Sequence, residues 1–373
     1  MSNPLPLTGV RVFELGSNLS GPYGTWILAA LGADVIKVER PGTGDDARAW
    51  GPPFWREAAT VFQVVNRDKS SITVDYKDPI ALADLRRRIT DKADVVLQNL
   101  RPGVADGLGL GATDMRALKP ALIYCNLWAF GATGPLSERP GFDALMQAFG
   151  GIMAVTGEEG QAPVRAGISV VDMGTGMWCA IGILAALNRR HLTGTGGVID
   201  ASLFETALGW TAYYNADVQV TGEPPKRHGS GVRGIAPYQA YDCADGYLVV
   251  AASNDRLFAN LARELGHPEW LDDPRFTDNP ARASNREDLN ALLIPLFKEQ
   301  PRAHWQERLD QAGVPNAPIQ HAGEVIAHPQ TQALGMLQDT GAGISLTGLP
   351  LSFDGERPAL RNIAPDLPEG NDD

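Results

Sequence analysis

The pattern of hydrophobic and polar positions near the N-terminus predicts a β-α-β unit. Residues 10–15, VRVFEL, and residues 34–39, DVIKVE, have the composition of buried strands, and residues 25–33 have a helical pattern. Ser20 can cap this helix, and Pro22 suits its first turn. The helix N-terminus should therefore direct free backbone N–H groups at the loop before it, which can hold an anion.

Strand and helix patterns go on alternating as far as residue 128. This alternation is typical of an α/β fold in which helices cover a parallel sheet. The strand candidates are residues 70–76, 93–100 and 121–128, and the helix candidates are residues 81–89 and 115–120. A longer helix is expected over residues 177–191, because basic residues at its end precede Gly194. Asp172 lies at or just before the first turn of this helix.

Residues 221–234, TGEPPKRHGSGVRG, are rich in proline, glycine and basic residues and predict a linker into a second unit. Residues 236–252 then predict a hairpin with Asp245 and Gly246 at its turn, and helical patterns follow to about residue 315. The second unit is therefore expected to be a smaller α+β domain.

The composition supports two domains and limits the ligands. A chain of 373 residues exceeds the roughly 250 to 300 that one core usually serves. Its net charge of −12 opposes binding to nucleic acid or an anionic membrane, so an anionic ligand needs a local basic cluster. The longest apolar run, residues 177–187, is shorter than the roughly 20 residues of a membrane span, and the first residues do not resemble a secretory leader.

The three cysteines, Cys125, Cys179 and Cys243, form no C-x-x-C motif, and no histidine pair has helical spacing. A disulfide framework and a zinc site are therefore not expected. The chain is expected to be a cytoplasmic protein without a metal.

The glycine-containing loop after residue 15 admits two interpretations. Glu39 ends the second strand, as the acidic residue of a nicotinamide-binding unit would. Gly16, Gly21 and Gly24 do not make the G-x-G-x-x-G spacing, however, so a nicotinamide enzyme is disfavoured. A phosphate-binding loop and ordinary turn glycines remain equally open.

Asp172 also has two interpretations. An aspartate in a first helical turn commonly accepts backbone N–H bonds, and base rates favour this structural role. The same N–H groups would keep the carboxylate ionised, so that it could attack a bound thioester.

Two other features are expected to be structural. The basic run of residues 86–88 is expected to be a solvated helix face, and Met177 and Trp178 are expected in the core.

Seven ordered segments closely resemble the class III CoA-transferases of the CaiB/BaiF type. This is the family of formyl-CoA transferase, which also includes α-methylacyl-CoA racemases. The segments span nearly the whole chain: residues 9–48, 66–75, 98–110, 141–151, the stretch around Asp172, 196–205 and 312–330.

The resemblance implies a Rossmann-like large domain, a small α+β domain and an interlocked homodimer in which two chains thread one another. The large domain would comprise residues 1–220 and be completed by residues 316–373, with residues 221–315 as the small domain. Threaded chains are rare exceptions among protein topologies, and composition does not suggest them.

The resemblance also implies a catalytic role for Asp172. The family's aspartate attacks an acyl-CoA to give a mixed anhydride and CoA thiolate, which then forms an aspartyl-CoA thioester. A carboxylic acid takes the CoA through a second anhydride. By the same resemblance, the CoA site would comprise Asn18, Leu19, Ser20, Arg40, Asn99, Leu100 and Arg101.

Other positions match the family's active-site loop and acyl pocket. Gly229, Gly231 and Gly234 fall where the transferases have a mobile glycine-rich loop, although a flexible linker explains them equally well. Trp50 falls where a tryptophan lines the acyl pocket of formyl-CoA transferase, yet WGPP is also a simple turn.

Phe142 bears on the choice between the family's two chemistries. Racemases of this family use a histidine in a Gly-His-Asp segment, and here the segment is Gly141-Phe142-Asp143. Phenylalanine cannot move a proton, so CoA transfer is favoured over racemisation. Asp143 could shape the pocket or serve as a helix cap.

A non-catalytic acyl-CoA-binding protein is a third hypothesis, and retention of Asp172 disfavours it. The sequence leaves the identity of the acids open.

Overall fold

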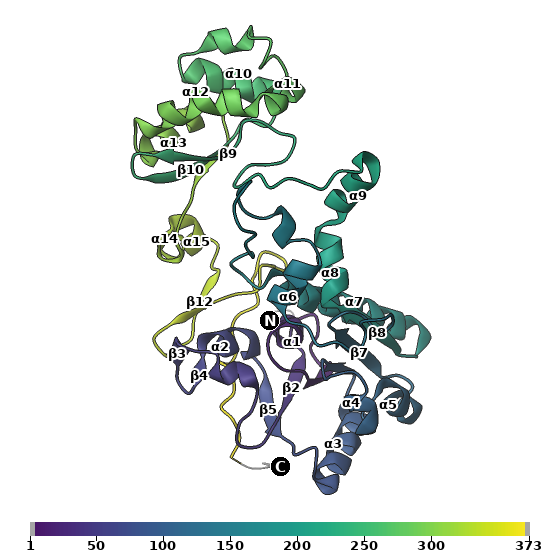
Figure 1. The fold of residues 1–373 in the computed structure, drawn as a ribbon. Coiled ribbons are helices and arrows are strands. Elements are labelled where there is room, and N and C mark those ends of the chain that lie inside the picture. Colours follow the sequence, from purple (N-terminus) through teal and green to yellow (C-terminus); the bar gives the residue numbers. More distant parts are fainter. Residues whose placement is uncertain (1–3, 370–373) are drawn as a thin grey trace. The chain divides into compact units, whose positions relative to one another are not determined.

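A computed structural model describes residues 4–369, which divide into two compact units (Figure 1). Of these residues, unit 1 comprises 4–152, 165–223 and 329–369, and unit 2 comprises 153–164 and 224–328. The small domain was expected to end at residue 315, but unit 2 extends to residue 328, so residues 316–328 belong to it and not to the large domain. Residues 153–164, which the sequence analysis placed in the large domain, group with unit 2.

Unit 1 is built on a six-stranded parallel sheet in the order β5-β2-β1-β6-β7-β8. Successive residues of a strand point to opposite faces, and helices cover both. Val12, Val95 and Cys125 pack with α1 and α7 on one face, while neighbouring residues pack with α3 and α5 on the other. The strands are β1 (Arg11–Leu15), β2 (Asp34–Glu39), β5 (Ser70–Thr73), β6 (Val95–Gln98), β7 (Ile123–Trp128) and β8 (Gly197–Ser202).

Helices and short strands complete unit 1. The helices are α1 (Ser20–Ala30), α2 (Thr60–Asn66), α3 (Pro79–Lys92), α4 (Val104–Gly107), α5 (Ala112–Leu118), α6 (Asp143–Phe149), α7 (Val170–Thr193), α8 (Leu203–Trp210), α9 (Ala212–Thr221) and α15 (Pro329–Ala333). The short strands are β3 (Phe54–Trp55), β4 (Ala58–Ala59), β12 (Leu337–Asp339) and β13 (Ser345–Thr347), and a 3₁₀ turn spans Asp46–Ala49. The C-terminal segment lies beside the turn that follows α2, since Asp68 in this turn accepts hydrogen bonds from the backbone N–H groups of Arg361 and Asn362.

Unit 2 has its own hydrophobic core around a three-stranded antiparallel sheet in the order β11-β10-β9. Cys243 pairs with Gly246, so Ala244 and Asp245 form the hairpin turn, and Gly246 begins a strand instead of lying in the turn. The elements are β9 (Tyr238–Cys243), β10 (Gly246–Ala251), β11 (Asn316–Pro318), α10 (Asp255–Glu264), α11 (Asn279–Ser284), α12 (Arg286–Lys298), α13 (Arg302–Gln311) and α14 (Ala322–Ala327), with 3₁₀ turns at Met153–Val155 and Pro268–Leu271.

Helix α7 is longer than expected. Its 24 residues are long and apolar enough to cross a membrane by length and composition alone, but it packs on the sheet and against α1. Met177 and Trp178 correct the sequence analysis: they lie on the outer side of α7, 46% and 49% exposed in the single chain. Apolar residues on this face are available to contact another surface.

A cluster of buried charges supports the first β-α loop. Glu14 of β1 binds the ammonium groups of Lys37 at 2.8 Å and Lys69 at 2.7 Å, and it accepts a hydrogen bond from Thr25 of α1. Lys37 also binds Asp45 at 2.8 Å. Burial alone would raise the pKa of Glu14, but the two ammonium groups outweigh it and lower the pKa to about 2.

Replacing Glu14 should show how much the stability of the folded protein depends on these buried ion pairs. We expect Glu14→Gln to lower the free energy of unfolding by about 3–5 kcal/mol, because two buried ammonium groups lose their counter-charge. In the parent, the contribution of Glu14 should be complete above pH 4.5 and should be lost as the pH falls toward 2. Urea unfolding across this range checks both effects. Exposed Glu57→Gln is the control, and equal stability of the two variants would refute the assignment.

Candidate functional site

The strand order places a crevice at the carboxyl ends of β1 and β6. The chain proceeds outward from these two strands in opposite directions, which makes a topological switch point where α/β proteins bind ligands. Asn99, just after β6, ties the two loops together. Its side chain accepts a hydrogen bond from Ser17 N at 2.9 Å and donates one to Ser17 O at 2.8 Å.

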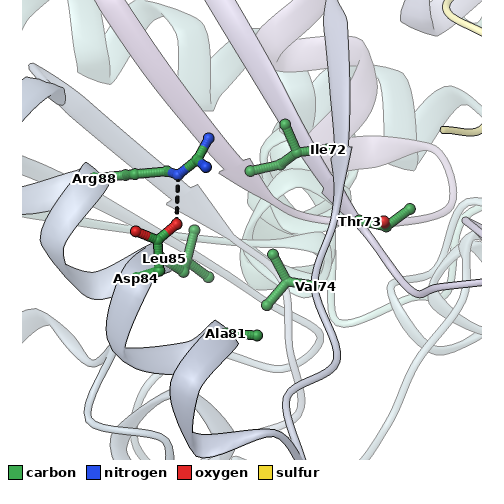
Figure 2. Close-up of a pocket in the computed structure, with 7 residues that line it drawn as sticks. All are labelled: Ile72, Thr73, Val74, Ala81, Asp84, Leu85 and Arg88. Atoms are coloured by element: carbon green, nitrogen blue, oxygen red, sulfur yellow. Dashed lines mark hydrogen bonds and ion pairs between the residues drawn. The ribbon is translucent and has the colours of Figure 1, made fainter. Parts of the chain in front are cut away.

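A cavity of about 430 Å³ opens at this crevice, which is large enough for part of a cofactor-sized ligand. Its walls come from the loops after β1, β2, β6 and β7 and from the first turns of α7 and α8. Among the residues that line it are Asn18, Leu19, Ser20, Trp50, Asn99, Leu100, Arg101, Trp128, Arg139, Phe142 and Asp172. The small cavity between β5 and α3 is different: its space of about 20 Å³ holds little more than a water molecule (Figure 2).

Asp172 lies in the first turn of α7, and its carboxylate is partly buried. Ser20 donates a hydrogen bond from its hydroxyl to Asp172 Oδ1. Ser20 is the first residue of α1 and does not cap it, because Leu19 holds the cap position without a side-chain bond. The cap expected of Ser20 is therefore wrong, and its hydroxyl serves Asp172 instead.

Asp143, the first residue of α6, caps α7 from outside that helix. Its Oδ1 accepts hydrogen bonds from the backbone N–H groups of Val171 at 2.9 Å and Asp172 at 3.2 Å. Gln147 donates to its Oδ2 at 2.6 Å. Among the described residues, no backbone N–H donates to the Asp172 carboxylate. The helix cap expected of Asp172 is thus supplied by Asp143.

This arrangement changes the acidity of Asp172. Burial raises its pKa to about 6, the Ser20 hydrogen bond opposes the rise, and the charge of Asp143 adds to it. The expectation that helix N–H groups would favour the ionised form is therefore not met. At pH 7 the carboxylate is still mostly ionised, because the pH lies about one unit above the pKa.

Close packing of α1 on α7 brings Ser20 to Asp172. A Cβ added to Gly176 would lie 2.5 Å from Ser20 O, and one added to Gly24 would lie 2.7 Å from Gly176 O. Only glycine allows the two backbones to approach this closely. Gly176 is one helical turn after Asp172, so the contact fixes the position of the carboxylate along the axis of α7 relative to Ser20.

Two arginines add positive charge to one part of the cavity lining, which also includes Asp46 and Asp172. Within residues 4–369, the side chains of Arg101 and Arg139 are exposed and have no hydrogen-bond or ion-pair partner, so both are available to an anion. Arg40 lines an adjoining cavity of about 220 Å³ with Tyr76 and pairs there with Asp46. The two cavities share Ser17, Asp46 and Leu100.

A nicotinamide cofactor finds less support at this site. Glu39, the residue that a nicotinamide ribose would need, is buried and binds Arg48 at 2.7 Å and Ser71 at 2.6 Å. In the part of the chain that the structure describes, no group of three or more His, Cys, Asp or Glu side chains could hold a metal ion.

Comparison with known proteins identifies the family. Residues 7–372 match the family model described as CoA-transferase family III. The chain belongs to this family. It is 38% identical to human succinyl-CoA:glutarate CoA-transferase over 91% of this chain and 77% of that protein. It is also 38% identical to acetyl-CoA:oxalate CoA-transferase of Acetobacter aceti, over 98% and 93% of the two chains.

Solved structures agree with this assignment. A CAIB/BAIF family protein from Brucella suis superposes with a TM-score of 0.89 at 40% identity, covering 98% of this chain and 97% of that one. The α/β architecture with the six-stranded parallel sheet is thus that of the CoA-transferase family.

The residues expected from the sequence fall into two groups. Those in unit 1 gather at the crevice: nine line the main cavity, Arg40 lines the adjoining one, and Asp143 lies behind Asp172. Gly229, Gly231 and Gly234 belong to unit 2, in a loop where Gly229 N donates to Gly157 O at 2.9 Å.

Several residues that line the main cavity were not expected from the sequence, among them Trp128 and Arg139. Trp128 ends β7 and donates to Asp200 at 3.1 Å, and Arg139 precedes the Gly-Phe-Asp segment by one proline. The end of a predicted parallel strand pointed to Trp128. A basic residue beside an active-site motif was the signal for Arg139.

The helix contact gives a prediction of stability and geometry. Gly176→Ala should lower the free energy of unfolding by about 1–3 kcal/mol, because the new methyl group meets the Ser20 backbone. Gly209→Ala, in α8 with open space around it, is the matched control and should be neutral or stabilising. Thermal unfolding of both variants measures this difference, and a neutral Gly176→Ala would refute the close contact.

Proposed function

We propose that this protein transfers coenzyme A from an acyl-CoA to a carboxylic acid, with Asp172 as the covalent nucleophile. The observation that carries the proposal is the Asp172 carboxylate in the wall of the switch-point cavity, held by one hydroxyl and facing a site with two available arginines. A carboxylate that is partly dehydrated but still ionised at neutral pH is suited to attack a thioester carbonyl.

Transfer would proceed in four acyl-transfer steps. An oxygen of Asp172 attacks the donor thioester carbonyl, and the C–S bond breaks to give an anhydride and CoA thiolate. The thiolate attacks Cγ of Asp172 and displaces the donor acid, which leaves an aspartyl-CoA thioester. The acceptor carboxylate attacks the same Cγ, releasing the thiolate and forming a second anhydride. Thiolate attack on the acceptor carbonyl then yields the new acyl-CoA and regenerates Asp172.

The CoA phosphates would meet the positive part of the cavity. Arg101 and Arg139 can form charge-assisted hydrogen bonds with phosphate, and the backbone of residues 17–20 lies at the same edge. This local cluster meets the requirement set by the overall charge of −12. The adjoining cavity beside Arg40 and Tyr76 offers room for a further part of the cofactor.

Short dicarboxylic acids are the acceptors that we propose to test first. Similar proteins are named for glutarate and oxalate, with succinyl-CoA and acetyl-CoA as partners. Trp50, Trp128 and Phe142 would bound the acyl site. Racemisation is the second candidate, but Phe142 offers no proton at the position that its histidine would take.

Two further features belong to the proposal. Exposed apolar residues on α7 and its neighbours, including Met177, Trp178, Ile181 and Trp210, favour a homodimer that covers them. The assignment of Gly229, Gly231 and Gly234 to an active-site loop also stays a proposal. Gly229 and Gly234 have positive φ angles, which give the loop turns that other residues rarely adopt. The cytoplasmic location stays a prediction.

Replacing the nucleophile tests the proposal most simply. Asp172→Ala should reduce CoA transfer from succinyl-CoA to glutarate or oxalate by at least about 10³-fold, because no covalent intermediate can form. Chromatographic assay of acyl-CoA products measures the rate. Asp91→Ala, on the exposed side of α3, is the control. Full activity of Asp172→Ala would refute the mechanism, and exchange of α-hydrogen for solvent deuterium by the parent would favour racemisation.

The arginine lining predicts an effect on substrate binding. Arg101→Gln should raise KM for acyl-CoA by roughly 10- to 100-fold and change kcat less, because a charge-assisted phosphate contact is lost. Arg87→Gln, which removes a surface arginine paired with Asp84, should leave KM unchanged. Initial rates at two salt concentrations separate a specific contact from general screening. Equal KM values for both variants would exclude Arg101 from the CoA site.

A further inference from the structure

We propose that Ser20 is a catalytic hydrogen-bond donor that stays on a single oxygen of Asp172 throughout the reaction. The inference rests on the proposed function and assigns Ser20 a role other than binding CoA. Its basis is the hydrogen bond from the Ser20 hydroxyl to Asp172 Oδ1. Within residues 4–369, Asp172 Oδ2 has no partner and is the oxygen available to attack.

The position of Ser20 is fixed by the fold. Its side chain is buried, and its backbone carbonyl contacts Gly176 where α1 and α7 meet. The loop before it is tied to β6 through Asn99 and to the buried charges through Asp45, which accepts a hydrogen bond from Asn18 N at 3.0 Å. A donor held by a rigid frame needs little reorganisation when charge develops beside it.

Because Asp143 occupies the backbone N–H groups nearby, Ser20 is the only hydrogen-bond donor to the Asp172 carboxylate among the described residues. The backbone N–H groups of Val171 and Asp172 could otherwise bind the carboxylate, but they are taken by Asp143 Oδ1. The protein therefore leaves Oδ2 without a hydrogen bond, as suits a nucleophile, and gives Oδ1 a single hydroxyl donor.

The chemistry uses this asymmetry twice. When Oδ2 attacks the donor thioester, Oδ1 remains the carbonyl oxygen of the aspartyl group. Thiolate attack on Cγ then places negative charge on Oδ1, and collapse of this intermediate expels the donor acid with Oδ2. Attack by the acceptor carboxylate on the aspartyl-CoA thioester again charges Oδ1 and expels the thiolate. In both steps Ser20 donates to the oxyanion, and the acceptor's bridging oxygen becomes the new Oδ2.

An isotope count tests this assignment directly. With an excess of acceptor acid labelled with ¹⁸O in both carboxylate oxygens, in unlabelled water, the parent should carry one ¹⁸O on Asp172 after many turnovers. Only Oδ2 is exchanged, and Ser20 keeps the carboxylate from turning over. Ser20→Ala should lower kcat by about 10²- to 10³-fold, and the freed carboxylate should acquire a second ¹⁸O. Mass spectrometry of the peptide that contains Asp172 gives both counts.

Controls separate a catalytic role from a structural one. Ser20→Thr keeps the hydroxyl and should recover much of the rate and the single label, while Ser70→Ala, on the edge strand β5, should match the parent. Loss of Ser20 should also move the acid limb of the kcat–pH profile upward, because its hydrogen bond lowers the pKa of Asp172.

The possible outcomes are distinguishable. The role of Ser20 would be overturned by two ¹⁸O labels in the parent, by an unchanged kcat in Ser20→Ala, or by a single label in that variant. None of these results would contradict the assignment of Asp172 as the nucleophile. Transfer without any label on Asp172 in the parent would instead overturn the proposed function itself.

Discussion

The crossing of α1 and α7 leaves no room for a side chain at Gly24 or Gly176, and the site depends on that closeness. One helix brings the first β-α loop and Ser20, and the other brings Asp172. If the two axes were further apart by the width of a methyl group, the hydroxyl and the carboxylate would be out of hydrogen-bonding range. A backbone contact in the core thus determines the chemistry at the surface.

The charges around this contact are divided between two layers. Beneath the loop, Glu14 balances Lys37 and Lys69, so ionised groups are buried without an uncompensated charge. At the cavity, Asp143 takes the helix N–H groups that would have made Asp172 a weaker base. Burial then raises the pKa of Asp172 to about 6, which leaves the carboxylate ionised at neutral pH and less solvated than a surface aspartate.

Much of the fold follows from local sequence patterns. The strands of the large sheet, the long helix that ends before Gly194 and the position of Asp172 in its first turn are all apparent from hydrophobic periodicity and capping residues. The order of the strands places the ends of β1 and β6 together, so residues such as Asn18 and Asn99 could be expected at one crevice.

Several of the errors have a common physical origin, since they depend on how residues far apart in the chain are arranged. Ser20 has the sequence of a helix cap, and its bond to a residue 152 positions away reverses that expectation. Asp143 caps a helix that begins 27 residues after it. Met177 and Trp178 have the composition of core residues but lie on the outer side of α7. Local patterns contain no information about such pairings.

In the mechanism that we propose, Asp172 carries the CoA in a covalent thioester. The most direct measurement is mass spectrometry of protein quenched rapidly after mixing with acyl-CoA in the absence of an acceptor acid. We expect a CoA adduct on the peptide that contains Asp172 and release of one donor acid for each adduct. An adduct on another residue, or rapid transfer of CoA without any adduct on Asp172, would contradict this mechanism.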